Sequence, residues 1–174
     1  HRAVTQVEPS MLRNVTTVAA PARRLADLGL DAGRQGALEA AVAAGADRAE
    51  PLRLLFVDEE GDGRDVAEAV AAAAGQRLLL ASPTDFVSRW FGETECKLRD
   101  FFALARAVAP VTVGLLHLEG LTGAASGSAG SGLERVAAQL LDELADRRAQ
   151  VNVVASINRA DLVDHRLRRG FVVV

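Results

Sequence analysis

The chain has 174 residues, of which 49% are hydrophobic and 25% charged, the balance of a globular protein able to bury a core. Its net charge of −3 argues against a nucleic-acid partner. The single cysteine, Cys96, excludes a disulfide framework and fits a cytoplasmic location, and no apolar run approaches the roughly 18 residues that cross a bilayer, so we expect no direct membrane insertion.

The first half of the chain predicts an irregular lead-in followed by alternating helices and strands. Residues 1–25 are weakly periodic and contain Pro9 and Pro21, which favours a loop with at most one short strand. The alanine-rich residues 31–46 predict a helix with Asp31 as its N-cap. A strand at 52–57, a helix at 64–74 that ends at Gly75, and a strand at 78–81 follow.

The second half continues the alternation. Residues 93–109 have apolar side chains at helical spacing, and Pro110 ends that helix. Residues 111–118 are apolar almost throughout, which is typical of a central parallel strand. The glycine-rich and serine-rich residues 120–132 predict a mobile segment. A helix at 133–148, a strand at 151–157, a short helix or turn at 161–168 and a strand from Phe171 complete the prediction.

Strands that alternate with helices predict an α/β domain with a mainly parallel sheet and right-handed crossovers. In such sheets, ligands bind outside the carboxyl ends of the strands. This rule directs attention to residues 58–65, 82–93, 116–121 and 158–169.

Three stretches of the chain follow one another as they do in a known family. The most specific runs from Asp85 to Pro110, the others are residues 133–144 and 153–164, and residues 25–42 are a weaker match. Together they resemble the AAA+ ATPases, in the class that contains valosin-containing protein, NSF and the peroxisomal-biogenesis ATPases. The resemblance implies a P-loop-type large α/β subdomain with a five-stranded parallel sheet over residues 25–174, after a lead-in of residues 1–24, with the helical lid outside this chain.

The resemblance also implies a ring, usually a hexamer, that unfolds and translocates proteins. It places Arg89, Trp90, Phe91 and Gly92 on the loop that lines the central pore, where an aromatic side chain can grip an unfolded polypeptide. The alternative for Trp90 is a place in the core. The family's inter-subunit arginine corresponds to Arg168 or Arg169, which would act on a neighbour's nucleotide. The implied partners are therefore neighbouring AAA+ subunits, in a homo- or hetero-hexamer, and unfolded polypeptide.

The segment that should hold ATP departs from the pattern of a working P-loop. In G-x-x-x-x-G-K-[ST], backbone N–H groups wrap the phosphates, the lysine reaches the β- and γ-phosphates, and the hydroxyl holds Mg²⁺. Here Val57 or Asp58 takes the first glycine position, depending on the alignment, and Arg64 and Asp65 replace the lysine and the hydroxyl residue. Each approach of a like charge to within about 4–5 Å costs on the order of 1 kcal/mol. Five carboxylates would face a triphosphate here: Asp58, Glu59, Glu60, Asp62 and Asp65.

The third predicted parallel strand leads to the same expectation. The family has an Asp that supports Mg²⁺ and a Glu that orients water at its end, where this chain has Leu116 and His117. Only Glu119 matches a later family acid, and Asn158 matches the polar sensor of the fourth strand. We therefore expect degenerate Walker motifs, no hydrolysis, no catalytic residue and no metal ligand. ATP or ADP, if either binds, would bring Mg²⁺ and contact Gly61, Gly63, Arg64, Asp65 and Asn158.

The sequence leaves two alternatives open. One is a weakly active ATPase in which Arg64 replaces the P-loop lysine, keeping its charge with a different reach. The other, from residues 54–75 alone, is a receiver-like signalling domain in which paired acids hold Mg²⁺. That alternative lacks an Asp phosphoacceptor at the end of the third strand. A calcium-binding loop starting at Asp58 is disfavoured because Ala69 stands where the bidentate Glu belongs.

Overall fold

A computed structural model describes residues 15–82, 93–122, 130–162 and 165–174. The strands are β1 (Thr16–Val18), β2 (Arg53–Val57), β3 (Arg77–Ala81), β4 (Val111–Leu115), β5 (Val151–Ile157) and β6 (Val172–Val173). The α-helices are α1 (Ala32–Arg48), α2 (Gly63–Ala74), α3 (Glu93–Ala107), α4 (Glu119–Thr122), α5 (Gly130–Ala145) and α6 (His165–Gly170). Single 3₁₀ turns lie at Leu25–Asp27 and Ala160–Leu162.

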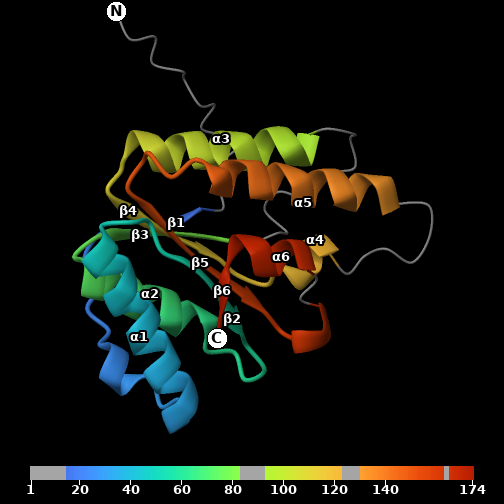
Figure 1. Ribbon diagram of the computed structural model, residues 1–174. Helices are drawn as coiled ribbons and strands as arrows, with labels where there is room; N and C mark the ends of the chain where they lie inside the picture. Colours follow the sequence, from blue (N-terminus) through green and yellow to red (C-terminus); the bar gives the residue numbers. More distant parts are fainter. Residues whose placement is uncertain (1–14, 83–92, 123–129, 163–164) are drawn as a thin grey trace, which may run out of the picture.

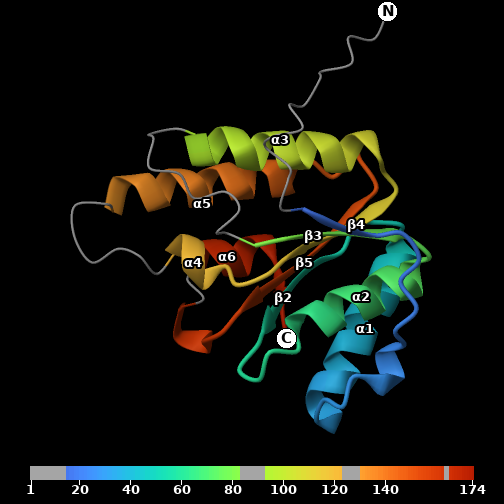
Figure 2. The ribbon, with the colours of Figure 1, turned by 180° about the vertical axis from the view of Figure 1, so that it is seen from behind.

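The strands form one sheet in the order β1-β3-β4-β5-β2-β6. Five of them run parallel, as predicted, and β1 adds a sixth strand that pairs antiparallel with β3. Helices α3 and α5 cover one face of the sheet, and α1 and α2 cover the other (Figures 1 and 2). This arrangement confirms the predicted α/β class, in which strands covered on both faces are apolar throughout.

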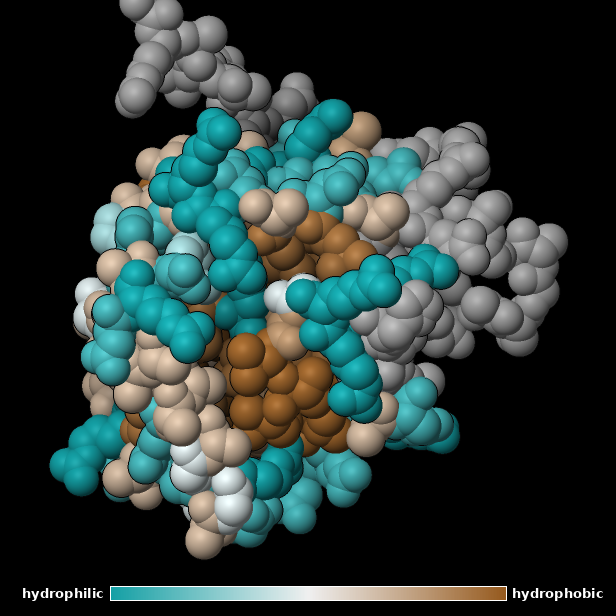
Figure 3. Space-filling view, in the orientation of Figure 1, coloured by the Kyte–Doolittle hydropathy of each residue, from teal (hydrophilic) through white to brown (hydrophobic). Residues whose placement is uncertain are grey.

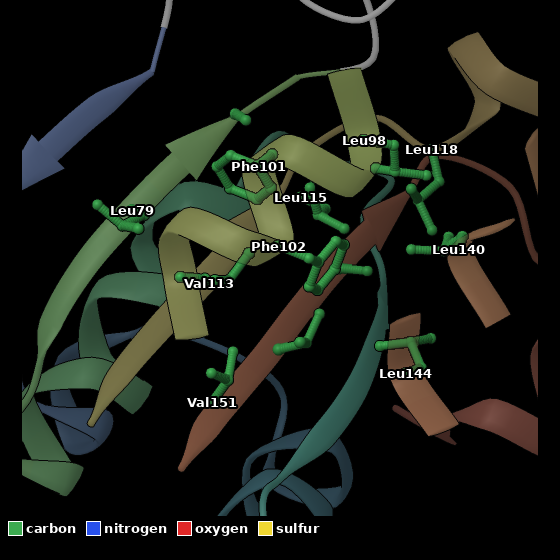
Figure 4. Close-up of a cluster of buried hydrophobic side chains, with 14 of the residues drawn as sticks. Leu79, Leu98, Phe101, Phe102, Val113, Leu115, Leu118, Leu140, Leu144 and Val151 are labelled. Atoms are coloured by element: carbon green, nitrogen blue, oxygen red, sulfur yellow. The ribbon is translucent and has the colours of Figure 1, made fainter. Parts of the chain in front are cut away.

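Two hydrophobic clusters lie on the two faces of the sheet. The larger contains Phe101 and Phe102 of α3 with Leu140 and Leu144 of α5, packed on β4 and β5 (Figure 4). The smaller joins α1 and α2 to the other face. There Gly114 of β4 leaves room for Leu80 of β3 and for α2, because an added Cβ would lie 2.6 Å from a methyl carbon of Leu80 and 3.2 Å from the Cβ of Ala67.

Most predicted boundaries agree with the structure, and local signals explain why. The Asp31 carboxylate accepts a hydrogen bond from the Arg34 amide at 2.9 Å, as expected of an N-cap. Gly75 ends α2 in the left-handed conformation, with φ 66°. None of the described helices is long and apolar enough to cross a membrane.

Several boundaries differ from the prediction, including the end of α5, which lies at Ala145 instead of residue 148. Strand β4 ends at Leu115 instead of residue 118, because the chain turns there and His117 adopts a φ of 63°. Part of the glycine-rich segment predicted as mobile is helical, since α4 occupies Glu119–Thr122 and α5 begins at Gly130. The residues between these helices, 123–129, lie outside the described part of the chain.

Candidate functional site

The candidate site is the turn that joins β2 to α2 at the carboxyl end of the sheet. Because β2 ends at Val57 and α2 begins at Gly63, Asp58 takes the first position of the turn. Its Oδ1 accepts hydrogen bonds from the amides of Gly61 and Asp62, both at 2.7 Å. Its Oδ2 accepts one from the Gly63 amide at 2.8 Å.

The Asp58 side chain points inward, and Asp58 is only 6% exposed. Its amide also donates to the Ile157 carbonyl at 2.7 Å, which fixes the turn to neighbouring β5. Consecutive N–H groups at a helix N-terminus form an anion-binding cradle, favoured further by the helix dipole. In this chain the anion in the cradle is the Asp58 carboxylate.

Gly63, the first residue of α2, allows the cradle to close. A Cβ on this residue would lie 2.8 Å from Ser156 Cβ and 2.9 Å from Oδ2 of Asp58. Gly61 contributes in another way, because its φ of 89° is rarely adopted by residues with a side chain. Both predicted glycines therefore shape the cradle around Asp58.

The two replaced positions of the P-loop pattern make ion pairs beside the cradle. The Nε of Arg64 lies 3.7 Å from a carboxylate oxygen of Glu68, one turn further along α2. Asp65 lies 3.2 Å from the Arg23 guanidinium, which also contacts Glu68 at 3.4 Å. The Arg64 side chain is 57% exposed. The two residues thus belong to a surface network along α2.

The turns after β4 and β5 lie next to the cradle. The hydroxyl of Ser156 accepts a hydrogen bond from the His117 amide at 2.9 Å. Glu119 contacts His117 Nδ1 at 3.3 Å and accepts a hydrogen bond from the Asn158 amide at 3.2 Å. Glu119 therefore connects the exposed Asn158 to His117. Within the described ranges, no three His, Cys, Asp or Glu side chains gather as metal ligands would.

The structure brings some of the predicted site residues together. Gly61, Gly63, Arg64 and Asp65 share one turn, and Asn158 follows the neighbouring strand. Arg168 and Arg169 lie exposed on α6. The predicted pore-loop residues Arg89, Trp90, Phe91 and Gly92 fall outside the described residues.

Two residues near the turn, Ser156 and Arg34, were not predicted from the sequence. Ser156 carries no sequence signal, because its place beside Gly63 depends on the pairing of β5 with β2. Arg34 stacks on Phe56 with its guanidinium carbon 4.2 Å from the ring centroid. It also donates to the carbonyls of Val57 and, at 3.3 Å, Val174. Arg34 thus holds together the ends of β2 and β6, beside the turn.

The sheet order and the strand–turn–helix at its carboxyl edge define a P-loop-type α/β domain. Residues 65–173 match the profile of the ATPase family associated with various cellular activities (AAA). The chain belongs to this family. The matched stretch begins at Asp65, the third residue of α2, so it does not include the turn that Asp58 occupies.

Several curated proteins are similar to the chain. It is 31% identical over 180 residues to the Cell division cycle protein 48 homolog of Archaeoglobus fulgidus, covering 96% of this chain and 24% of that protein. It is 34% identical over 123 residues to the ATPase family protein 2 homolog of Caenorhabditis elegans, covering 68% and 17%. It is 31% identical over 122 residues to Peroxisomal ATPase PEX6 of Arabidopsis thaliana, covering 67% and 13%. The chain thus spans about a quarter or less of these relatives.

Among solved structures, the FIGL-1 AAA domain in complex with ADP superposes with a TM-score of 0.71 at 18% identity, covering 97% of this chain and 61% of that one. The same domain in a second structure gives a TM-score of 0.72 at 18% identity, covering 100% and 63%. At this identity the likeness establishes the fold.

Proposed function

We propose that the chain is a degenerate AAA+ domain of a hexameric protein unfoldase or translocase, contributing ring assembly and pore-loop contact with substrate instead of ATP hydrolysis. The observation that carries this proposal is the Asp58 carboxylate in the anion cradle at the start of α2.

The residues present do not fit a nucleotide phosphate. A phosphate in the cradle would have to displace Asp58 from three amides, and each hydrogen bond to a charged group contributes about 1.5–3 kcal/mol. The exposed Glu59 and Glu60 add negative charge beside the same position. A triphosphate would therefore meet both an occupied cradle and like charges.

Hydrolysis lacks support from the neighbouring strand as well. Leu116 and His117 follow β4, where a metal-supporting Asp and a water-orienting Glu would be needed. The alternative of an ATPase that uses Arg64 receives no support, because Arg64 pairs with Glu68 on the outside of α2. The receiver-like alternative is set aside because the chain belongs to the AAA family.

The proposed ring role rests on the family and on α6. In this proposal Arg168 and Arg169 face a neighbouring subunit, and residues 89–92 contact unfolded polypeptide in the pore. Another ring or related subunits would then supply the energy of translocation. The proposal deals only with this domain, which matches a small part of each relative.

Calorimetric titration of the full-length protein with ATP or ADP and Mg²⁺ tests the proposal, with any second nucleotide site disabled by mutation. We expect no heat of binding at this domain up to about 1 mM nucleotide, a limit near −4 kcal/mol of affinity. The matched control is Glu59→Gln, which removes a charge beside the cradle and leaves Asp58 in place. A dissociation constant in the micromolar range for the unmodified domain would contradict the proposal.

A further inference from the structure

A hollow of about 500 Å³ lies at the amino ends of β2 and β6, whereas the Asp58 turn follows the carboxyl end of β2. Small-molecule sites typically enclose about 300–1,000 Å³. Figure 3 shows the molecule from the same side as Figure 1, with exposed hydrophobic side chains bordered by hydrophilic ones. We call the hollow the basic pocket, and the lining residues that define it are Arg48, Glu50, Leu52, Arg53, Arg147 and Phe171.

Arg53 places a buried positive charge at this pocket. It is the first residue of β2 and is 4% exposed. Its three nitrogens each donate one hydrogen bond, to the carbonyls of Val151, of Asp146 at 3.2 Å and of Leu144 at 3.5 Å. A guanidinium has five N–H groups, so both terminal nitrogens keep a second N–H that can donate to an anion. Burial and the charge of Arg147 lower the pKa of Arg53 to about 10, against a smaller opposing effect of Asp146. The pocket therefore holds positive charge that an anion would stabilise.

Arg48 and Arg147 add exposed guanidinium groups to the pocket. Arg48 is the last residue of α1, and Arg147 lies in the turn between α5 and β5. In the part of the chain that the structure describes, no ion pair joins either arginine to an acid. Three guanidinium groups from separate segments of the chain thus meet at one hollow.

Positive charge exceeds negative charge in and around the pocket. Glu50 is the one acidic residue among those that line it, and Asp146 is the acid that acts on the pKa of Arg53. A fourth lining arginine, Arg169, offsets Asp146, so the other three arginines stand against Glu50 alone. An excess of two positive charges favours a dianion. Because the proposed ring role places Arg169 at a neighbouring subunit, we assign the ligand to the other three arginines.

The rest of the pocket lining is mainly apolar. Leu52 and Phe171 form part of it and are 8% and 6% exposed, and Ala41, Ala44 and Pro51 lie beside them. An inorganic ion held by the arginines would leave this apolar surface in water. A ligand with an apolar body would cover the surface and gain from removing it from water. The lining therefore favours an organic anion over an inorganic one.

We propose that the basic pocket binds a small organic phosphate monoester, with its phosphate on the three arginines and its apolar body against Leu52 and Phe171. A phosphate monoester carries a charge of about −1.5 to −2 at pH 7, which matches the excess positive charge of the pocket. Each planar guanidinium can donate two parallel hydrogen bonds to phosphate oxygens. The site is separate from the cradle that Asp58 fills, and it requires neither ATP binding nor ring assembly.

Calorimetric titration of the full-length protein with phenyl phosphate tests the site, because this probe joins a phosphate monoester to an apolar ring. Inorganic phosphate supplies the charge without the ring, and benzyl alcohol supplies the ring without the charge. Phenyl phosphate should bind at least tenfold more tightly than inorganic phosphate, and benzyl alcohol should give no heat of binding. Added sodium chloride should weaken the binding of phenyl phosphate, since salt screens charges at an open site.

Substitutions at exposed positions locate the binding. Arg147→Gln and Arg48→Gln should each weaken the binding of phenyl phosphate, the first at least tenfold. Ala44→Glu, at an exposed position of α1, places a carboxylate at the pocket and should abolish binding. Arg148→Gln removes an exposed arginine outside the pocket and is the matched control; Glu59→Gln, at the other end of β2, is a second control. Both controls should bind like the wild type.

Each contrary result overturns the proposal in a different way. Equal affinities for phenyl phosphate and inorganic phosphate would show that the apolar lining takes no part. Unchanged binding in Arg147→Gln and Ala44→Glu would place the phosphate outside the pocket, and a changed affinity in Glu59→Gln would place it at the Asp58 turn. An absence of heat with phenyl phosphate up to about 1 mM, near −4 kcal/mol of affinity, would show that the pocket holds no such ligand.

Discussion

Replacing Asp58 by Ala should destabilise the domain and open the cradle. The change removes the acceptor of three backbone N–H groups. Hydrogen bonds to a charged acceptor contribute about 1.5–3 kcal/mol each, but water can reach the amide of exposed Gly61 and partly that of Asp62. The Gly63 amide is buried and stays unpaired. We therefore expect a loss of about 3–5 kcal/mol in unfolding free energy.

Urea unfolding followed by circular dichroism measures this loss. The matched control is Glu59→Gln, an exposed neighbour that should change stability by less than about 0.5 kcal/mol. Asp58→Asn should fall between the two, because its amide oxygen keeps part of the acceptor role while its NH₂ group cannot accept from the Gly63 amide. A loss below about 1 kcal/mol for Asp58→Ala would refute the reasoning, since three charged hydrogen bonds cannot be removed so easily.

The opened cradle should also respond to added anions. If Asp58 occupies an anion site, sulfate or phosphate should stabilise Asp58→Ala more than the wild type, which gains only the general stabilisation that these salts give to folded proteins. An anion at 100 times its dissociation constant adds about 2.7 kcal/mol, which a thermal melt detects as a raised Tm. Equal responses of the two proteins to sulfate would show that Asp58 does not take the place of a bound anion.

Three further changes test other parts of the structure. Arg64→Lys with Asp65→Thr should give no ATP hydrolysis in a phosphate-release assay, because Asp58 still fills the cradle; turnover from this double variant alone would contradict our account. Gly63→Ala should cost at least about 2 kcal/mol in urea unfolding, since its Cβ would lie 2.8 and 2.9 Å from atoms of two neighbouring side chains; unchanged stability would show that they move aside freely. Burial lowers the pKa of Arg53 to about 10, so above that pH the unfolded chain binds the proton more tightly than the folded one. The stability of the wild type relative to Arg53→Met should then rise by up to about 1.4 kcal/mol per pH unit above pH 10, and a difference that does not change with pH would show that burial does not lower the pKa of Arg53.

The fold follows from the sequence because its signals are local. Each signal depends on only a few neighbouring residues: short apolar runs form the strands, Asp31 caps α1, and Gly75 ends α2. The alternation of strands and helices could therefore be predicted. The end of β4 was not, because the turn at His117 depends on Ser156 of another strand, which accepts its amide. The extra strand β1 was foreseen only as one short strand within an irregular lead-in.

The chemistry of the site was harder to predict than its location. The sequence marks the turn and its departures from the P-loop pattern. From the sequence, Asp58 is one of five acids expected to repel a triphosphate. In the folded turn, however, the Asp58 carboxylate accepts hydrogen bonds from backbone amides of the same turn. The proximity of Arg53 and Arg147 cannot be predicted along the chain either, because the two residues come together only when β2 pairs with β5.

The internal carboxylate also constrains how this domain could change over evolutionary time. A lineage that replaced Asp58 by glycine would first carry unpaired amides and lower stability. It would not yet have the P-loop lysine and hydroxyl residue, or the Asp and Glu at the positions of Leu116 and His117, with which to use a nucleotide. Selection against unstable intermediates would therefore oppose this first step, so the buried carboxylate makes a phosphate-binding turn difficult to reach by single substitutions.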